Sequence, residues 1–176
     1  MNYHTDIQNS ILGYALNSTE TVSGAELVAE MDKCRVAQAV CSLMPDDLEC
    51  DLDISNRKLY EACVASEGRI LPCPIVAPDE FEPEYSAEKQ IGRALDNGAP
   101  MVRIRPVVDS WEILPWVSGN LFSALQAHRL PLLLDQTVGF KLIGEIAAGY
   151  PGLPLIIYNV SYRSSRILPQ LLDAFD

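Results

Sequence analysis

The feature of the sequence that most constrains its fold is a strict alternation of short apolar runs with segments of helical periodicity. From residue 24 onward the two patterns follow one another along the chain. Strands that alternate with helices are typical of βαβ units, in which the strands are parallel and helices cover the sheet. With a weaker strand near the N-terminus, the pattern predicts an α/β protein of six strands and six helices.

The predicted helices combine apolar residues three or four positions apart with capping signals. Ser23 and Glu26 form a capping box at the start of the first helix, which runs to about Cys34. Further helices are predicted at residues 53–65, 85–95, 121–128, 140–148 and 166–175. Strands are predicted at residues 3–7, 36–44, 69–77, 101–107, 130–135 and 153–160, and a long loop at residues 109–119.

No glycine-rich phosphate-binding turn follows any predicted strand, which favours a barrel over an open nucleotide-binding sheet. A (β/α)8 TIM barrel usually needs roughly 250 residues. The chain has 176 residues and stops after a helix. We therefore expect a single domain, residues 1–176, of incomplete (β/α)8 type with about six units, truncated before strands seven and eight. Open strand edges favour pairing between copies, so a homo-oligomer is a further expectation.

The composition narrows the classes of partner. With 13 basic and 24 acidic side chains, the net charge of -11 disfavours binding to nucleic acid or to anionic lipid. No apolar run approaches the roughly 20 residues that span a bilayer, and no secretory signal is visible, so we expect a cytoplasmic protein. The five cysteines, none in a C-x-x-C pair, are expected to be reduced thiols that mostly pack in the core.

In a barrel of parallel strands, chemistry takes place at the carboxyl ends of the strands. Arg103 and Arg105 alternate on one face of the fourth predicted strand, and a guanidinium can hold a carboxylate in bidentate fashion. They are therefore the best substrate-binding candidates, with Arg105 preferred because it lies nearer the strand end. The alternative is that at least one of them is structural, stacked or paired with an acid such as Asp135.

Other candidates lie in the loops that follow the strands. Trp111, Trp116 and Asp109 belong to the loop after strand four, where Trp111 would either form an aromatic wall of a pocket or pin the loop to the body. Tyr162 and Arg163, after strand six, are weaker candidates. Asp135 would act as a general base only if it, rather than its neighbour Gln136, pointed inward. His128, at a helix end, is expected on the surface.

Several short runs are not specific alone, but their order and spacing along the chain are informative. They are Met-Asp at 31–32, Asn-Arg at 56–57, Val-Arg-Ile-Arg-Pro at 102–106, Leu-Pro-Leu at 130–132 and Tyr-Pro at 150–151. Residues 111–119 and 162–172 add to the pattern. Together they resemble the amidohydrolase-related family of amidohydrolase 2 type. Its members are TIM barrels that hydrolyse or decarboxylate small carboxylate-bearing substrates, normally with a divalent metal such as zinc.

The resemblance also shows what this chain lacks. In that family the first strand usually ends D-x-H-x-H, and strands five and six commonly add one histidine each. Here Gln8, Ser10, Gln136 and Asn159 stand at those four positions, and an amide or hydroxyl oxygen is a poor ligand for a zinc-type ion. The resemblance therefore implies a lost metal site and no metal cofactor. The shifted pair of His4 and Asp6 is a weaker possibility for a metal.

Two functions remain open at this point. The first is an amidohydrolase-like hydrolase or decarboxylase without the usual metal, in which Arg105 binds a small-molecule carboxylate and the four polar replacements position the reacting group. The second is a non-catalytic ligand-binding or structural relative. In that case the replacements Gln8, Ser10, Gln136 and Asn159 would be filled by water and mutual hydrogen bonds. Catalytic residues cannot be assigned from the sequence under either hypothesis.

Overall fold

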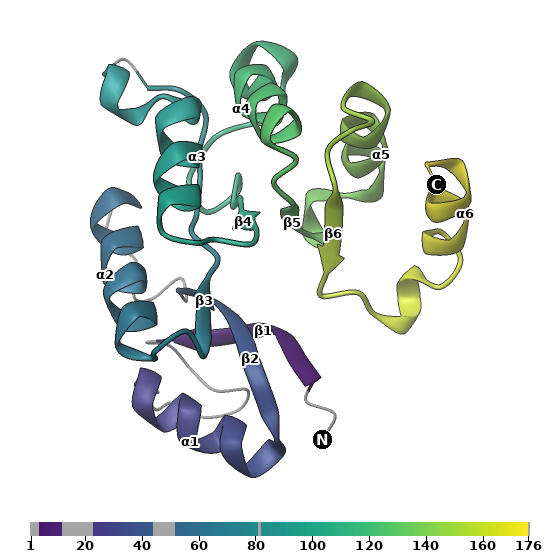
Figure 1. Ribbon diagram of the computed structural model, residues 1–176. Coiled ribbons are helices and arrows are strands. Elements are labelled where there is room, and N and C mark those ends of the chain that lie inside the picture. Colours follow the sequence, from purple (N-terminus) through teal and green to yellow (C-terminus); the bar gives the residue numbers. More distant parts are fainter. Residues whose placement is uncertain (1–3, 12–22, 44–51, 81, 176) are drawn as a thin grey trace. The chain divides into compact units, whose positions relative to one another are not determined.

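The computed structural model describes residues 4–11, 23–43, 52–80 and 82–175, and gives only the backbone for residues 4–11. In this part of the chain six strands alternate with six α-helices, as the sequence predicts (Figure 1). The chain divides into two compact units, which are described in turn. The first is Met1–Ile75 with Arg93–Pro100, and the second is Val76–Gly92 with Met101–Asp176.

The first unit contains a parallel sheet in the order β1-β2-β3. Its strands are β1 (His4–Ile11), β2 (Val36–Leu43) and β3 (Ile70–Pro72). The helices α1 (Gly24–Cys34) and α2 (Leu52–Ala65) pack against each other and against β2. Apolar side chains from both helices and the sheet form the core, namely Leu27, Met31, Ala39, Cys41, Leu43, Leu59, Cys63 and Ile70.

The predicted capping box at the start of α1 is confirmed. The backbone N–H of Glu26 donates to Ser23 Oγ at 3.3 Å, and the Glu26 carboxylate accepts from the Ser23 backbone N–H at 2.8 Å. These reciprocal bonds satisfy two N–H groups that a helix start otherwise leaves unpaired. Hydrogen bonds from the Ser23 side chain and backbone lower the pKa of Glu26.

The third strand is shorter than the predicted 69–77. Pro72 and Pro74 have no N–H to donate to a neighbouring strand, so regular pairing ends at Pro72. Beyond Pro72, amide side chains form hydrogen bonds with the backbone N–H and carbonyl groups of two residues. Asn56 donates to the carbonyl of Ile75 at 2.8 Å and accepts from its N–H at 3.0 Å. Gln90 makes the same pair of bonds to Ala77, at 3.1 and 3.0 Å.

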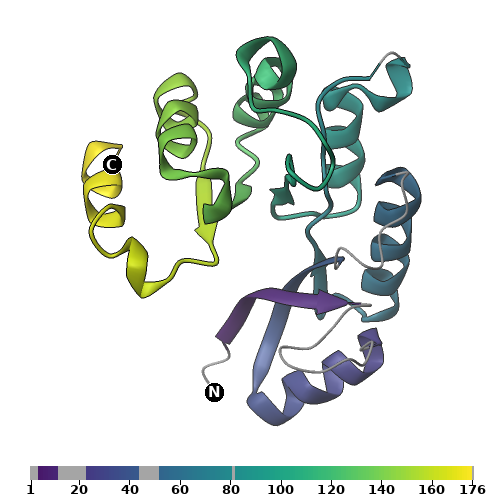
Figure 2. The same ribbon diagram turned by 180° about the vertical axis from the view of Figure 1, so that it is seen from behind.

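The second unit contains the parallel sheet β4-β5-β6. Its strands are β4 (Val102–Arg103), β5 (Leu132–Asp135) and β6 (Leu155–Tyr158). The helix α3 (Ala87–Asp96) begins in this unit, which also holds α4 (Pro115–His128), α5 (Phe140–Gly149) and α6 (Leu168–Ala174). Both views show α4, α5 and α6 lying in chain order (Figures 1 and 2). Buried side chains hold this unit together, among them Val102, Leu121, Phe122, Leu125, Leu132, Leu134, Ile143 and Ile146.

Two predictions for the second unit were wrong. Strand four was predicted to reach residue 107 but ends at Arg103, because the chain turns back after Arg105. The loop predicted at 109–119 is shorter, since α4 begins at Pro115 rather than at residue 121. Proline suits the first position of a helix, where its missing N–H is not needed and its φ is already helical.

The structure also bears on the predicted burial of the cysteines and on the expected lack of a membrane-spanning segment. Cys41, Cys63 and Cys73 are buried and are not in disulfides, whereas Cys34 is exposed and Cys50 lies outside the described residues. Burial raises the pKa of the Cys63 thiol to about 12, which keeps it protonated and unreactive. None of the described helices is long and apolar enough to cross a membrane.

Candidate functional site

A row of polar side chains lies at the carboxyl ends of the strands of the second unit. In the pairing of β4 with β5, Arg103 lies opposite Leu133. Two residues further along β5, Asp135 lies opposite Tyr158 of β6. Alternate residues of a strand share a face, so Arg103, Asp135 and Tyr158 lie on the same side of the sheet. The neighbouring residues of β5, Leu132 and Leu134, are fully buried on the other side, in the core.

Tyr158 joins this row into a network. Arg103 Nη2 donates a hydrogen bond to the Tyr158 hydroxyl, and the guanidinium carbon lies 5.0 Å from the centre of the tyrosine ring. The hydroxyl in turn donates to Asp135. Burial is the main cause that raises the pKa of Tyr158, to about 12, although the charge of Arg103 acts in the opposite direction. Tyr158 is therefore a neutral link between a cation and an anion.

The carboxylate of Asp135 is held in place from several sides. It accepts from the backbone N–H of Thr137 at 2.8 Å and, at 3.4 Å, from the Asn159 side chain. Partial burial acts to raise the pKa of Asp135, but these bonds and that from Tyr158 outweigh it, so the pKa lies below its usual 3.8. An ionised, fully engaged carboxylate of this kind is suited to orienting neighbours rather than to accepting a proton near neutral pH.

Arg105 forms a second, more deeply buried group with Asp109. The side chain of Arg105 is 5% exposed and that of Asp109 is 14% exposed, and Nη2 lies 2.5 Å from Oδ1. Burial lowers the pKa of Arg105 and raises that of Asp109, in each case against the effect of the opposite charge. The alternative that at least one of the two arginines is paired with an acid or stacked is thus confirmed, since Arg105 pairs with Asp109, rather than Asp135, and Arg103 lies over the ring of Tyr158.

This group keeps unpaired hydrogen-bonding atoms. Among the described residues nothing bonds to Nε and Nη1 of Arg105, to Oδ2 of Asp109, to Nε of Arg103 or to Nε1 of Trp111, although all of these atoms are buried. Nε and Nη1 together carry three of the five N–H donors of a guanidinium. Buried polar atoms without partners are rare and call for an explanation, such as a ligand or ordered water.

The two amides at the ends of strands five and six are engaged with each other. Gln136 Nε2 donates to the backbone carbonyl of Asn159, and Gln136 Oε1 accepts from the Ser164 hydroxyl at 2.6 Å. The Asn159 side chain donates to Asp135, and its backbone has φ of 60°, a left-handed conformation that asparagine tolerates. The polar atoms of Gln136 are thus already in hydrogen bonds within the protein.

These contacts bear on whether a divalent metal would fit. No group of three or more His, Cys, Asp or Glu side chains that could hold an ion occurs in the described part of the chain. The one carbonyl oxygen that Gln136 could offer accepts from Ser164 instead. The side chains of Gln8, Ser10, His4 and Asp6 lie outside the described residues. The described donors at the predicted positions therefore do not fit a zinc-type ion.

The remaining candidates differ in their surroundings. Trp111 is partly buried, and its backbone N–H donates to the carbonyl of Pro106 at 2.9 Å, which closes the turn after β4. Trp116 is 82% exposed and Tyr162 is 92% exposed, so neither is enclosed in a pocket. Arg163 is also exposed. His128 ends α4 and lies 3.0 Å from the Glu88 carboxylate near the surface.

Sequence reasoning did not identify Tyr158 or the pairing role of Asp109. Tyr158 could have been found from the alternation of β6, because Ile156 and Tyr158 share a face as Leu133 and Asp135 do. For Asp109 the signal is weaker. It stands four residues after Arg105 with Pro106 between them, which is compatible with a tight turn but does not specify one.

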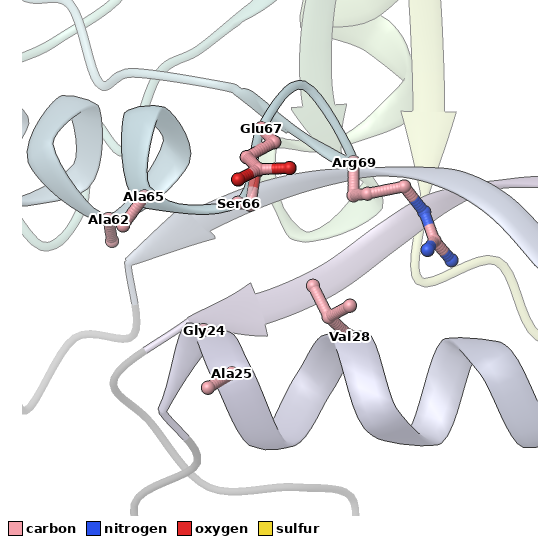
Figure 3. A pocket seen from close by; sticks show the side chains of 8 residues that line it. All are labelled: Gly24, Ala25, Val28, Ala62, Ala65, Ser66, Glu67 and Arg69. Atoms are coloured by element: carbon pink, nitrogen blue, oxygen red, sulfur yellow. The ribbon is translucent and has the colours of Figure 1, made fainter.

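A separate cavity of about 550 Å³ lies in the first unit. It is lined by the start of α1, including Gly24 and Val28, and by the end of α2 with Ser66, Glu67 and Arg69 after it (Figure 3). Arg69 is occupied there, since it pairs with Asp32 and with backbone carbonyls of β2. None of the candidate residues whose side chains the structure describes lines this cavity.

The structure resembles solved TIM-barrel enzymes. A 4-oxalomesaconate hydratase from Rhodopseudomonas palustris matches with a TM-score of 0.68 and 10% identity, over 97% of this chain and 67% of that one. An amidohydrolase 2 from Bifidobacterium longum subsp. infantis matches with a TM-score of 0.57 and 16% identity, over 94% and 67%. A 5-carboxyvanillate decarboxylase from Novosphingobium aromaticivorans, with bound manganese and 3-methoxy-4-hydroxy-5-nitrobenzoic acid, matches with 0.62 and 17%, over 88% and 65%.

These likenesses confirm the predicted fold, which is that of amidohydrolase 2 type TIM barrels with an incomplete set of βα units. No protein family model and no curated protein matches the chain. Of three further matching structures the chain spans 51%, 52% and 73% of the length. Hydratases, decarboxylases and hydrolases share the fold, so the fold by itself does not determine the reaction.

Proposed function

We propose that this chain belongs to a small-molecule enzyme of amidohydrolase type, a hydrolase or decarboxylase, that binds a carboxylate-bearing substrate at Arg105 without the usual metal site. The observation that carries the proposal is the burial of the Arg105 side chain, which is only 5% exposed, while its Nε and Nη1 have no partner among the described residues. A desolvated guanidinium with free donors is a strong recognition element for a carboxylate. A cytoplasmic location and action as one domain are part of the same proposal.

The neighbours of Arg105 give the site its remaining polar groups. Arg103 contributes a second positive charge and an unpaired Nε, and Trp111 contributes an unpaired N–H. The Arg103–Tyr158–Asp135 network holds Arg103 in position. Gln136 and Asn159, in the same unit, would add neutral polar groups, although Gln136 must first give up its bonds to Asn159 and Ser164.

Binding of benzoate to the full chain, measured by calorimetry, tests this function. Arg105→Met should weaken binding about tenfold or more, because hydrogen bonds to charged groups contribute about 1.5–3 kcal/mol. Arg129→Lys is the matched control, since Arg129 is exposed at the end of α4. Treatment with a metal chelator should leave the affinity unchanged. Equal affinity of the wild type and Arg105→Met would overturn the proposal.

A second candidate function is a non-catalytic ligand-binding relative. The mutual hydrogen bonds of Gln136, Asn159 and Ser164 favour it, because they occupy polar atoms that a reacting substrate would need. A panel of aromatic and aliphatic carboxylic acids and their amides separates the two. Release of carbon dioxide or of amine above the buffer rate, lost in Arg105→Met, favours an enzyme. Binding without turnover of any compound favours the alternative.

A further inference from the structure

The backbone turn after β4 brings the carboxylate of Asp109 into contact with the guanidinium of Arg105. The N–H of Asp109 donates to the carbonyl of Arg105 at 2.9 Å, and the N–H of Trp111 donates to the carbonyl of Pro106 at 2.9 Å. Ser110 has φ of 57°, a left-handed conformation that costs free energy in a residue with a side chain. The turn after β4 therefore places a carboxylate of the chain itself against the proposed carboxylate-binding group.

The ion pair between Arg105 and Asp109 leaves several buried hydrogen-bonding atoms unsatisfied. A buried pair stabilises a fold only when the remaining donors and acceptors are also satisfied. Here Nε and Nη1 of Arg105 and Oδ2 of Asp109 have no partner among the described residues. Asp109 makes the contact to Nη2 that a bound carboxylate would make, but leaves the rest of the guanidinium free.

We propose that Asp109 is a proton-linked gate of the Arg105 site: a ligand carboxylate displaces it from the guanidinium, and the displaced side chain takes up one proton from solvent. This inference rests on the proposed carboxylate binding at Arg105. In the exchange one ion pair breaks and one forms at Arg105, and Asp109 changes from carboxylate to neutral acid. Binding of the anion and of the proton are therefore coupled.

The charges around Asp109 support this coupling. Arg105 and Arg103, both from the β4 segment, lower its pKa, while Tyr158 from β6 acts on Arg105 and Asp135 from β5 acts on Tyr158. Burial already raises the pKa of Asp109 despite the two arginines. A second carboxylate at Arg105 raises it further by like-charge repulsion and by removing the bond to Nη2. Affinity for the ligand should thus increase as the pH falls.

The test is calorimetric titration of the full chain with formate, acetate and benzoate, in two buffers of different ionisation enthalpy. The difference between the buffers gives the number of protons taken up per ligand. We expect uptake by the wild type and none by Asp109→Asn. Asp53→Asn is the matched control, because Asp53 also pairs with an arginine, Arg93, at 3.0 Å but in the first unit. Its uptake should equal that of the wild type.

The outcomes separate the gate from the proposed function. Binding without proton uptake, or equal uptake by Asp109→Asn, overturns the gate and leaves Arg105 as the carboxylate site. Absence of binding by all three acids overturns both. If Asp109→Asn does not fold, Asp109→Glu decides, since a longer acid moves the pH at which uptake is half-maximal. An unchanged midpoint then counts against Asp109 as the titrating group.

Discussion

Removal of the Asp109 carboxylate should strongly destabilise the fold. In Asp109→Ala the guanidinium of Arg105 stays buried, at 5% exposure, without the carboxylate that lies 2.5 Å from it. Two charges about 4 Å apart at an effective dielectric constant of 20 attract by about 4 kcal/mol, and breaking buried pairs costs about 3–5 kcal/mol. We therefore expect the free energy of unfolding in water to fall by about 3 kcal/mol or more.

The measurement is urea unfolding at neutral pH, followed by circular dichroism, with the slope against urea concentration as a check that the folded state is unchanged. Asp53→Ala is the control, because the Asp53–Arg93 pair is 36% and 37% exposed and should contribute only about 0–1 kcal/mol. The double variant Arg105→Met/Asp109→Leu should be close to the wild type in stability. A loss of under about 1 kcal/mol in Asp109→Ala would refute the reasoning.

Two further predictions concern hydrogen bonds at strand ends. Asp135→Ala should cost about 1 kcal/mol at neutral pH. Because the folded pKa of Asp135 lies below 3.8, this stabilisation is present above pH 3.8 and is lost as the pH falls through the folded value. Urea unfolding across pH checks this, and a gap that widens in acid contradicts it. Asn56→Ala should cost about 2 kcal/mol by leaving both backbone groups of buried Ile75 unpaired, and Asn56→Asp should cost similarly. Unchanged unfolding midpoints for both variants would contradict this role.

The helices other than α4, whose start was predicted too late, were predicted well because their signals are local. The capping box of Ser23 and Glu26 and the apolar face with Leu27 and Met31 are properties of adjacent turns, and α1 follows them. The last four strands were predicted too long, and the first was predicted too short. Their ends depend on which backbone groups find partners, and Pro72 together with the clamp from Asn56 decides this for β3 through residues far apart in the sequence.

The candidate site shows the same division. Arg103 and Arg105 were identified because alternation along a strand is visible in the sequence. Their partners were not, since Asp109 meets Arg105 only through a specific turn, and Tyr158 meets Arg103 only through the register of three strands. Engagement of Gln136 with Ser164, across 28 residues of sequence, was equally beyond any local pattern.

The central claim, that Arg105 is a carboxylate site, is tested most directly by nuclear magnetic resonance of the arginine Nε–H groups during titration of the full chain with benzoate. We predict that the Arg105 Nε–H signal shifts and becomes protected from exchange with water on saturation, because its free donor gains an acceptor. The signal of exposed Arg129 should not change. Saturation of the chain with benzoate while the Arg105 signal stays in place would contradict the claim.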